Sequence, residues 1–251
     1  MTESDILKEA ERIISAAADE GITLRLLGGT AIGFKCPSAK RPSVSRKYPD
    51  IDLVGLKKQS RQIRELFVKL GYSPNVAFNA LHSGSVGRLM FFDVERERRI
   101  DIFLDSFDMC HKIDLRDRLA LESFTLPVAD LLATKLQIFQ TNTKDFKDIV
   151  AMVLDYDVAE SDNLNAINGR RLAMLAADDW GIYKTFTLVI SKTVATLDSL
   201  DLKPEDKELV KKRLGRISEL MEAEPKSMKW KMRAKLGEKK QWYMLPDDMA
   251  D

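Results

Sequence analysis

The hydrophobic residues of this chain change their spacing about halfway along the sequence. Before residue 125, short apolar runs typical of strands alternate with stretches whose apolar residues recur every three or four positions, as in an amphipathic helix. After residue 126 only the helical spacing continues. With 251 residues, the chain is long enough for two hydrophobic cores. We therefore expect an α/β domain over residues 1–125 and a helical domain over residues 126–251.

The same patterns assign the individual elements. In the front domain they predict helices at 4–20, 30–35 and 58–70, and strands at 22–27, 51–56, 88–94 and 99–105. The charged turn ERER between the last two strands predicts a β-hairpin. In the rear domain they predict helices near 127–139, 143–156, 165–179, 182–199, 204–221 and 225–236. The expected fold is thus a small mixed sheet flanked by helices, followed by an all-α domain.

Charge and composition exclude several classes of protein. The chain has 40 Lys and Arg against 39 Asp and Glu, so a histone-like polyanion binder is excluded. The two cysteines, Cys36 and Cys110, lie in no metal-ligand spacing, which fits a reducing compartment. The N-terminus has no apolar signal core, and no apolar run is long enough to span a membrane. We expect a soluble, cytoplasmic protein with no membrane partner.

Three aspartates on predicted strands are the chemically informative feature. Asp50 and Asp52 lie two positions apart in DIDL, so both side chains face the same side of a strand. Asp101 lies within the apolar run RIDIF, where a buried carboxylate needs a partner. If the two strands are neighbours, the three carboxylates converge. Such a cluster suits Mg²⁺, and metals held in this way can polarise a triphosphate.

The structural alternative is that DID is a strand-end turn and that Asp101 forms an ion pair with Arg98 or Arg99. The residues upstream favour the metal hypothesis. An apolar strand leads into Gly28, Gly29 and Thr30 at the predicted start of a helix. Backbone N–H groups at such a turn can hold a phosphate.

The order of these motifs resembles that of the DNA polymerase β-like nucleotidyltransferase superfamily. The resemblance covers about residues 22–155 and is strongest to the AbiEii-like toxin nucleotidyltransferases and their relatives. It implies that the GGT turn of Gly28, Gly29 and Thr30 positions nucleotide phosphates. It also implies that the three aspartates, Asp50, Asp52 and Asp101, hold a divalent metal.

Three further matches support that branch of the superfamily. Arg46 stands four residues before Asp50, where the relatives carry an arginine. PVADLLATKLQIF resembles a helix of those proteins whose lysine, here Lys135, faces the site. TKDFKDIVAM resembles their RDxxDL helix and places Asp145 and Asp148 at the matching carboxylates. From its spacing alone, Lys135 lies at or inside an apolar helix face and needs an anionic partner, either these carboxylates or a phosphate; the alternative is a snorkelling surface lysine.

What the resemblance implies is a Mg²⁺-dependent enzyme that transfers an NMP group from an NTP to an acceptor hydroxyl and releases pyrophosphate. Asp50 and Asp52 would bind the metal, and Asp101 would complete the site and orient or deprotonate the acceptor. Arg46 and Lys135 would neutralise charge on the phosphates. The acceptor stays open between RNA, protein and a small molecule, and the toxin relatives imply an antitoxin partner. The alternative function is a non-catalytic nucleotide- or RNA-binding module with the same fold.

Two basic segments leave alternatives open. Residues 35–47 carry five Lys and Arg and no acidic residue, which indicates either a solvated loop or a grip on triphosphate or RNA. Residues 226–240 carry seven Lys and Arg and one Glu, with aromatic residues in and just after the run. This pattern suits nucleic-acid contact, but it also suits an exposed helix followed by a tail whose aromatic residues dock on the rear domain.

Overall fold

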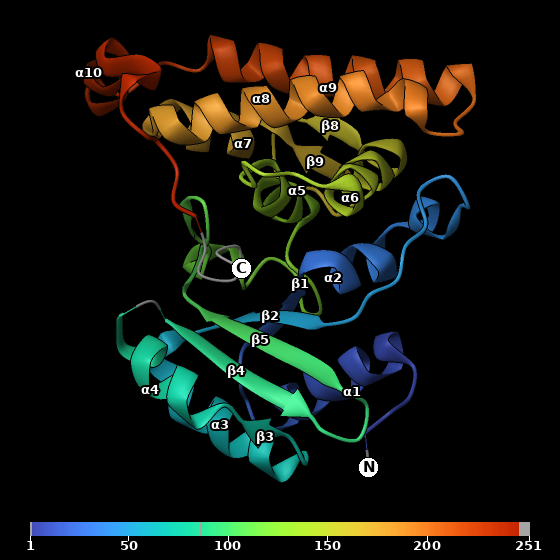
Figure 1. The fold of residues 1–251 in the computed structure, drawn as a ribbon, viewed down its shortest axis with the longest axis vertical. Helices are drawn as coiled ribbons and strands as arrows, with labels where there is room; N and C mark the ends of the chain where they lie inside the picture. The colour runs from blue at the N-terminus through green and yellow to red at the C-terminus, as the bar shows by residue number, and fades with distance from the viewer. Residues whose placement is uncertain (1, 86, 246–251) are drawn as a thin grey trace. The chain divides into compact units, whose positions relative to one another are not determined.

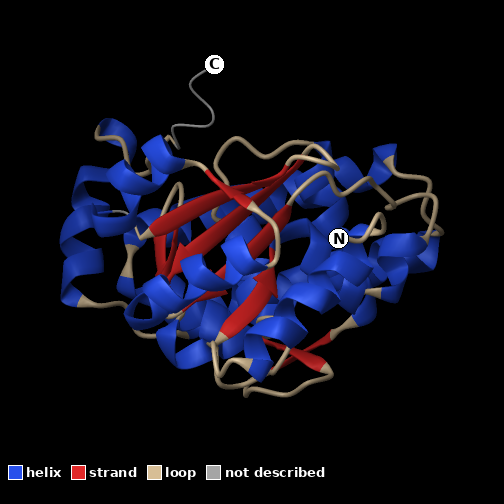
Figure 2. Ribbon diagram, turned by 90° about the horizontal axis from the view of Figure 1, so that it is seen from below, coloured by secondary structure: helices blue, strands red, loops and turns tan. Residues whose placement is uncertain are grey.

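The computed structural model describes residues 2–85 and 87–245, and it divides the chain into two compact units (Figures 1 and 2). Unit 1 comprises residues 1–35, 47–108 and 112–126, and unit 2 comprises residues 36–46, 109–111 and 127–251. The main division therefore falls one residue beyond the position expected from the sequence. Two short segments from the front of the chain belong to unit 2, which a linear pattern cannot reveal. Among the described residues, no helix is both long and apolar enough to cross a membrane.

Unit 1 is built on a mixed five-stranded sheet, as expected. Its order is β1 (Leu24–Leu27), β2 (Ile51–Gly55), β5 (Arg98–Leu104), β4 (Arg88–Asp93) and β3 (Ser73–Pro74). The β2–β5 pair is parallel and the other pairs are antiparallel, so the predicted hairpin is confirmed. One face of β2 and β5 is apolar and fully buried, with Ile51, Leu53, Ile100 and Ile102. The other face carries the buried Val54 and Phe103 beside Asp52 and Asp101.

The helices of unit 1 are α1 (Ile6–Asp19), α2 (Gly28–Lys35), α3 (Ser60–Lys69) and α4 (Val76–Ser85), of which α3 and α4 lie against one face of the sheet (Figure 1). The first three match predicted helices. The helix α4 was not predicted, because its apolar residues do not form a buried stripe: Val76 is 73% exposed and Leu81 is 72% exposed. A short hairpin, β6 (Ser106–Asp108) with β7 (Lys112–Asp114), completes the unit.

Unit 2 is mainly helical, with α5 (Val128–Leu136), α6 (Thr143–Asp155), α7 (Gly169–Asp178), α8 (Trp180–Thr196), α9 (Pro204–Ala223) and α10 (Met228–Leu236). The all-α expectation is wrong in one detail. Strands β8 (Asp157–Ala159) and β9 (Ala166–Asn168) form a parallel pair. The predicted helix over 165–179 therefore begins only at Gly169, where the Asn168 side chain accepts a hydrogen bond from the Arg171 N–H and caps it.

The basic segment that enters unit 2 is partly packed and partly exposed. Residues 37–40 form a short 3₁₀ helix, and both the N–H and the hydroxyl of Ser38 donate to the Asp155 carboxylate at 2.8 and 2.6 Å. Val44 is buried. Lys40 and Arg41 are exposed, and Arg41 pairs with Asp206 at 3.2 Å. The solvated-loop interpretation therefore holds for Lys40 and Arg41 but not for the buried parts of residues 36–46.

A histidine, His111, is buried in unit 2. The backbone N–H of His111 donates to Gln137 Oε1 at 2.6 Å, and the ring Nε2 lies 2.8 Å from the Thr185 hydroxyl. Burial lowers the pKa of His111 to about 4, and the nearby Asp179 only partly opposes this. The ring is therefore neutral in the folded chain at physiological pH.

This pKa predicts a pH-dependent loss of stability. The folded pKa lies below the unfolded value of 6.5, so the unfolded chain binds more protons between pH 6.5 and about 4. Stability is full above pH 6.5, and the free energy of unfolding should fall by about 3 kcal/mol as the pH drops to 4. Urea unfolding followed by tryptophan fluorescence at pH 7, 6 and 5 measures this, since all three tryptophans lie in unit 2. The His111→Gln variant should lose the slope between pH 6.5 and 5, whereas His82→Gln in unit 1 should keep it; equal slopes in all three proteins would contradict the prediction.

Candidate functional site

The register of the sheet in unit 1 aligns two of the three predicted aspartates. Leu27 of β1 lies opposite Asp52 of β2, and Asp52 lies opposite Asp101 of β5. Residues that are directly opposite on neighbouring strands place their side chains on the same face. One row across three strands is therefore formed by Leu27, Asp52 and Asp101.

The glycine turn contacts the aspartate pair directly. Gly28 begins α2 with a φ of +68°, a conformation that favours glycine. A Cβ at this position would collide with the Asp52 carboxylate, lying 2.9 Å from its Cγ. The hydroxyl of Thr30 donates to the backbone carbonyl of Asp50 at 2.7 Å. The GGT and DIDL motifs, some twenty residues apart in sequence, are thus packed against each other within unit 1.

Partly exposed and buried residues alternate along the DIDL motif, as expected for a strand with one partly exposed face. Ile51 and Leu53 are fully buried, whereas Asp50 and Asp52 keep part of their surface exposed. Their carboxylates are hard oxygen donors, and Mg²⁺ is commonly bound by one or two carboxylates together with substrate phosphates and water. These two residues therefore have the chemistry to hold a magnesium–nucleotide complex.

Asp101 is in a different environment, because it is completely buried. Its carboxylate forms ion pairs with Arg88 at 2.9 Å and with Arg99 at 2.8 Å. The ion pair with Arg99 is the structural alternative that the sequence left open. Arg98, the other candidate, donates instead to the carbonyls of Glu3 and Ser4. Two guanidinium groups thus neutralise the buried carboxylate of Asp101.

The donor set for a metal is therefore limited to two residues in this conformation. Among residues 2–85 and 87–245, no group of three or more His, Cys, Asp or Glu side chains is gathered closely enough to hold a metal ion. Cation binding by Asp50 and Asp52 and the assignment of Asp101 as a third ligand both stay predictions.

Comparison with known proteins adds no family to this geometry. The sequence matches no protein-family model, and it matches no curated protein at a significant level. The arrangement of the residues themselves is therefore the basis for inferring the function.

The predicted residues Arg46 and Lys135 lie together in unit 2. The Nε and Nη2 atoms of Arg46 donate to the two carboxylate oxygens of Asp148, each at 2.7 Å. Lys135 forms ion pairs with Asp145 at 3.0 Å and with Asp148 at 2.9 Å. We call these four residues the buried ion cluster. The prediction that Lys135 has an anionic partner on the 143–155 helix is confirmed, while phosphate binding by Arg46 and Lys135 stays a prediction.

The electrostatics of the buried ion cluster keep Lys135 and Asp148 charged. Burial alone would lower the pKa of Lys135, but the Asp148 and Asp145 carboxylates outweigh burial and raise it. Burial alone would raise the pKa of Asp148, but Lys135 and Arg46 outweigh burial and lower it below the usual 3.8. The stabilisation from Asp148 is therefore present at all pH values above 3.8 and is lost only as the pH falls through its lower folded value.

Sequence reasoning missed Arg88, the second cationic partner of Asp101. Arg88 stands two residues before Met90, which lies opposite Asp101 in the hairpin. Residues two apart share a face, so Arg88 and Asp101 are diagonal neighbours on adjacent strands, within reach of a long side chain. The predicted hairpin places Arg88 and Asp101 on adjacent strands, but the ERER turn alone does not fix which residues lie opposite each other.

The contact between the glycine turn and Asp52 predicts unequal effects of two alanine substitutions. Gly28 and Gly21 have nearly the same φ, +68° and +67°, but a Cβ at Gly21 would meet nothing within 4 Å. Gly21→Ala should cost about 1 kcal/mol of unfolding free energy, from backbone conformation alone. Gly28→Ala should cost several kcal/mol, because the methyl group also displaces the Asp52 carboxylate. Urea unfolding of both variants measures the difference, and equal costs would contradict the contact.

Proposed function

We propose that this protein is a nucleotidyltransferase that transfers an NMP group from an NTP to an acceptor hydroxyl. The observation that carries the proposal is the packing of the GGT turn against the DIDL motif in unit 1. It brings a helix N-terminus beside half-exposed carboxylates. Binding of a magnesium triphosphate requires a phosphate-binding turn next to a pair of metal-binding carboxylates.

The chain's own residues would have distinct roles. Backbone N–H groups at Gly28 and Gly29, with Thr30, would bind the β- and γ-phosphates and orient the α-phosphate. Asp50 and Asp52 would hold Mg²⁺, which when bound supplies positive charge to the phosphates. The acceptor oxygen then forms a bond to the α-phosphorus, the bond to the bridging oxygen of the β-phosphate breaks, and pyrophosphate leaves. The proton of the acceptor hydroxyl passes to a carboxylate, for which Asp101 is the candidate from the sequence.

One observation favours the alternative, a non-catalytic module that binds nucleotides. Asp101 is already neutralised by Arg88 and Arg99. A protein that only binds a nucleotide would need the glycine turn and the Asp50–Asp52 pair, but it would not need a third carboxylate that is available for chemistry.

A label-transfer assay separates these functions. The full chain is incubated with Mg²⁺ and each NTP, labelled either at the α- or at the γ-phosphate, in the presence of total RNA, total protein or a panel of small hydroxyl compounds. An NMP transferase moves the α-label to one acceptor, leaves the γ-label in pyrophosphate, and stops when EDTA removes the metal. Nucleotide binding without transfer of the α-label to any acceptor, or to the chain itself, would support the binding module and overturn the proposal.

A further inference from the structure

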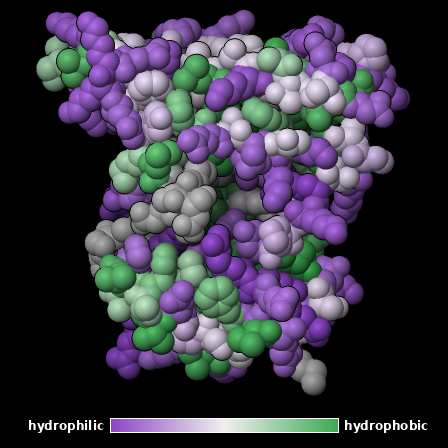
Figure 3. Space-filling model, in the orientation of Figure 1, coloured by the Kyte–Doolittle hydropathy of each residue, from purple (hydrophilic) through white to green (hydrophobic). Residues whose placement is uncertain are grey.

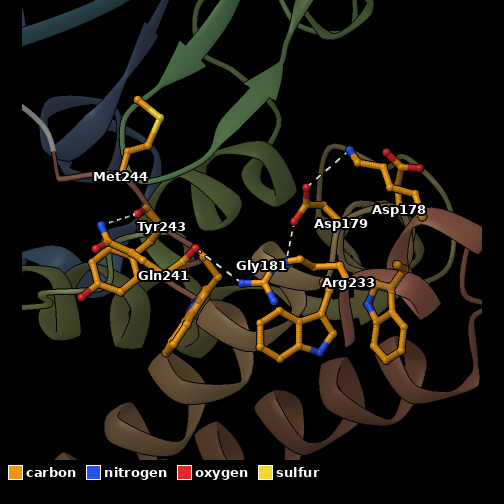
Figure 4. A pocket seen from close by; sticks show the side chains of 11 residues that line it. Asp178, Asp179, Gly181, Arg233, Gln241, Tyr243 and Met244 are labelled. Atoms are coloured by element: carbon orange, nitrogen blue, oxygen red, sulfur yellow. Dashed lines mark hydrogen bonds and ion pairs between the residues drawn. The ribbon is translucent and has the colours of Figure 1, made fainter. Parts of the chain in front are cut away.

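Unit 2 contains a cavity of about 400 Å³ that is unrelated to the GGT and DIDL motifs (Figure 4). It lies between the start of α8, the helix α10 and the segment 241–244. All three tryptophans of the chain, Trp180, Trp230 and Trp242, line it. This volume is in the range of pockets that hold small ligands, and an aromatic lining suits a planar one. We call it the tryptophan cavity.

The rings and the guanidinium that line the tryptophan cavity are held in place. The Arg233 guanidinium lies 4.7 Å from the centre of the Trp180 ring and donates to the carbonyls of Gly237 and Lys240 at 2.8 and 2.5 Å. The Trp242 ring lies edge-on to Trp180, and its Nε1–H donates to the Thr185 hydroxyl at 3.1 Å. Fixed indole and guanidinium planes are the surfaces on which unstacked nucleobases bind.

The charge next to the tryptophan cavity suits a phosphate backbone. Two exposed lysines just after α10, Lys239 and Lys240, form no ion pair with any residue of the described chain. The Lys240 carbonyl accepts a hydrogen bond from Arg233, which lines the cavity. Lys231 and Lys235 are also unpaired, but helical spacing places them on the face of α10 opposite the cavity-lining Lys229 and Arg233. The single acidic residue of the segment 226–240, Glu238, pairs with Lys184 at 2.5 Å. In Figure 3 the surface over α10 is largely hydrophilic, with a few apolar side chains. The positive charge of Lys239 and Lys240 is therefore available to an anion beside the cavity.

From these observations we infer that unit 2 binds single-stranded nucleic acid, with one base in the tryptophan cavity and the adjoining phosphates at Lys239 and Lys240. A duplex keeps its bases stacked inside, so it could meet the lysines but could not fill the cavity. The apolar side chains of α10, Met228, Met232 and Leu236, are exposed on the same helix. An acidic protein or an anionic membrane would use those side chains and the lysines, and would leave the cavity empty.

The tryptophans provide the test. The full chain, without NTP or Mg²⁺, is titrated with a 12-nucleotide single-stranded RNA while tryptophan fluorescence is recorded, because stacking of a base quenches indole emission. We expect saturable quenching by the single strand and none by the matched duplex. Affinity should fall about tenfold or more between 50 and 200 mM salt if three or more phosphates are contacted. An acidic peptide and anionic phospholipid vesicles serve as the competing probes.

Matched variants assign the effect to the cavity and its lysines. The K239E/K240E double variant should bind the single strand at least about tenfold more weakly, whereas K231E/K235E, with the same charge change on the opposite face of α10, should change affinity by less than about threefold. Trp230→Ala removes an indole that lines the cavity and should weaken binding about fivefold or more. The proposal is overturned if the two double variants weaken binding equally, if duplex quenches as well as single strand, or if only the peptide or the vesicles change the emission.

This inference does not depend on NMP transfer. An Asp52→Asn variant should bind the single strand as tightly as wild type, because Asp52 lies in unit 1. Loss of label transfer with intact quenching would overturn the proposed function alone, and transfer without quenching would overturn the nucleic-acid site alone.

Discussion

Replacing Asp52 with asparagine should lower the rate of NMP transfer about 1,000-fold while the chain stays folded. The substitution keeps the shape of the side chain against the glycine turn, but it removes one of the two charged oxygen ligands that we propose for the metal. A metal ion supplies several kcal/mol of charge stabilisation in such reactions, and each 1.36 kcal/mol is a factor of ten in rate. The α-label transfer assay, at saturating NTP, measures the effect.

A matched variant controls for charge. Asp117→Asn makes the same change at an exposed position of unit 1 and should transfer the label at the wild-type rate. Thermal unfolding of the two variants shows whether either loses stability. A folded Asp52→Asn protein that transfers NMP as fast as wild type would show that Asp52 is not a metal ligand.

Removing Asp148 should destabilise unit 2 by about 3–5 kcal/mol. The Asp148→Ala variant leaves Arg46 and Lys135, each with only 11% of its side chain exposed, with Asp145 as the remaining carboxylate of the buried ion cluster. An uncompensated buried cation costs far more than a lost surface ion pair. Urea unfolding at pH 7, followed by tryptophan fluorescence, gives the change in unfolding free energy.

Asp206→Ala is the control for this prediction. Asp206 also pairs with an arginine of the segment 36–46, but the Arg41 side chain is 49% exposed. Exposed ion pairs contribute about 0–1 kcal/mol, so this variant should lose less than 1 kcal/mol. Similar losses in the two variants would mean that the buried ion cluster contributes no more than a surface pair.

The elements of the fold could largely be predicted because each leaves a local pattern. In α1, buried residues at Ala10, Ile13, Ile14 and Ala17 follow the helical spacing, and the helix ends just before Gly21, as the sequence indicated. The failures have local causes as well. The helix α4 shows no buried stripe, and residues 166–168 adopt a strand because they pair with residues 157–159, a contact that no local rule contains.

The candidate site was only partly predictable. Motif spacing identified Gly28, Asp52 and Asp101, and the sheet register places the two aspartates opposite each other. Spacing offered Arg99 as one partner of Asp101, but it could not identify the second, Arg88, because Arg88 comes from a neighbouring strand whose register depends on the whole sheet. For the same reason, a basic segment that looked available for phosphates proved to be partly packed within unit 2, with Arg46 bound to Asp148.

The sequence by itself determined which residues carry charge, where the periodicity changes from mixed to helical, and where glycine permits a turn. These properties depend on neighbours within a few positions. Only the tertiary structure decided which charges are already paired and which remain available. Charge pairing depends on distances of about 3 Å between residues far apart in the chain, and burial determines how much each pair matters. The near-neutral chain thus contains compensated buried ion pairs at Asp101 and Asp148, and a lysine-rich helix whose charge is not compensated.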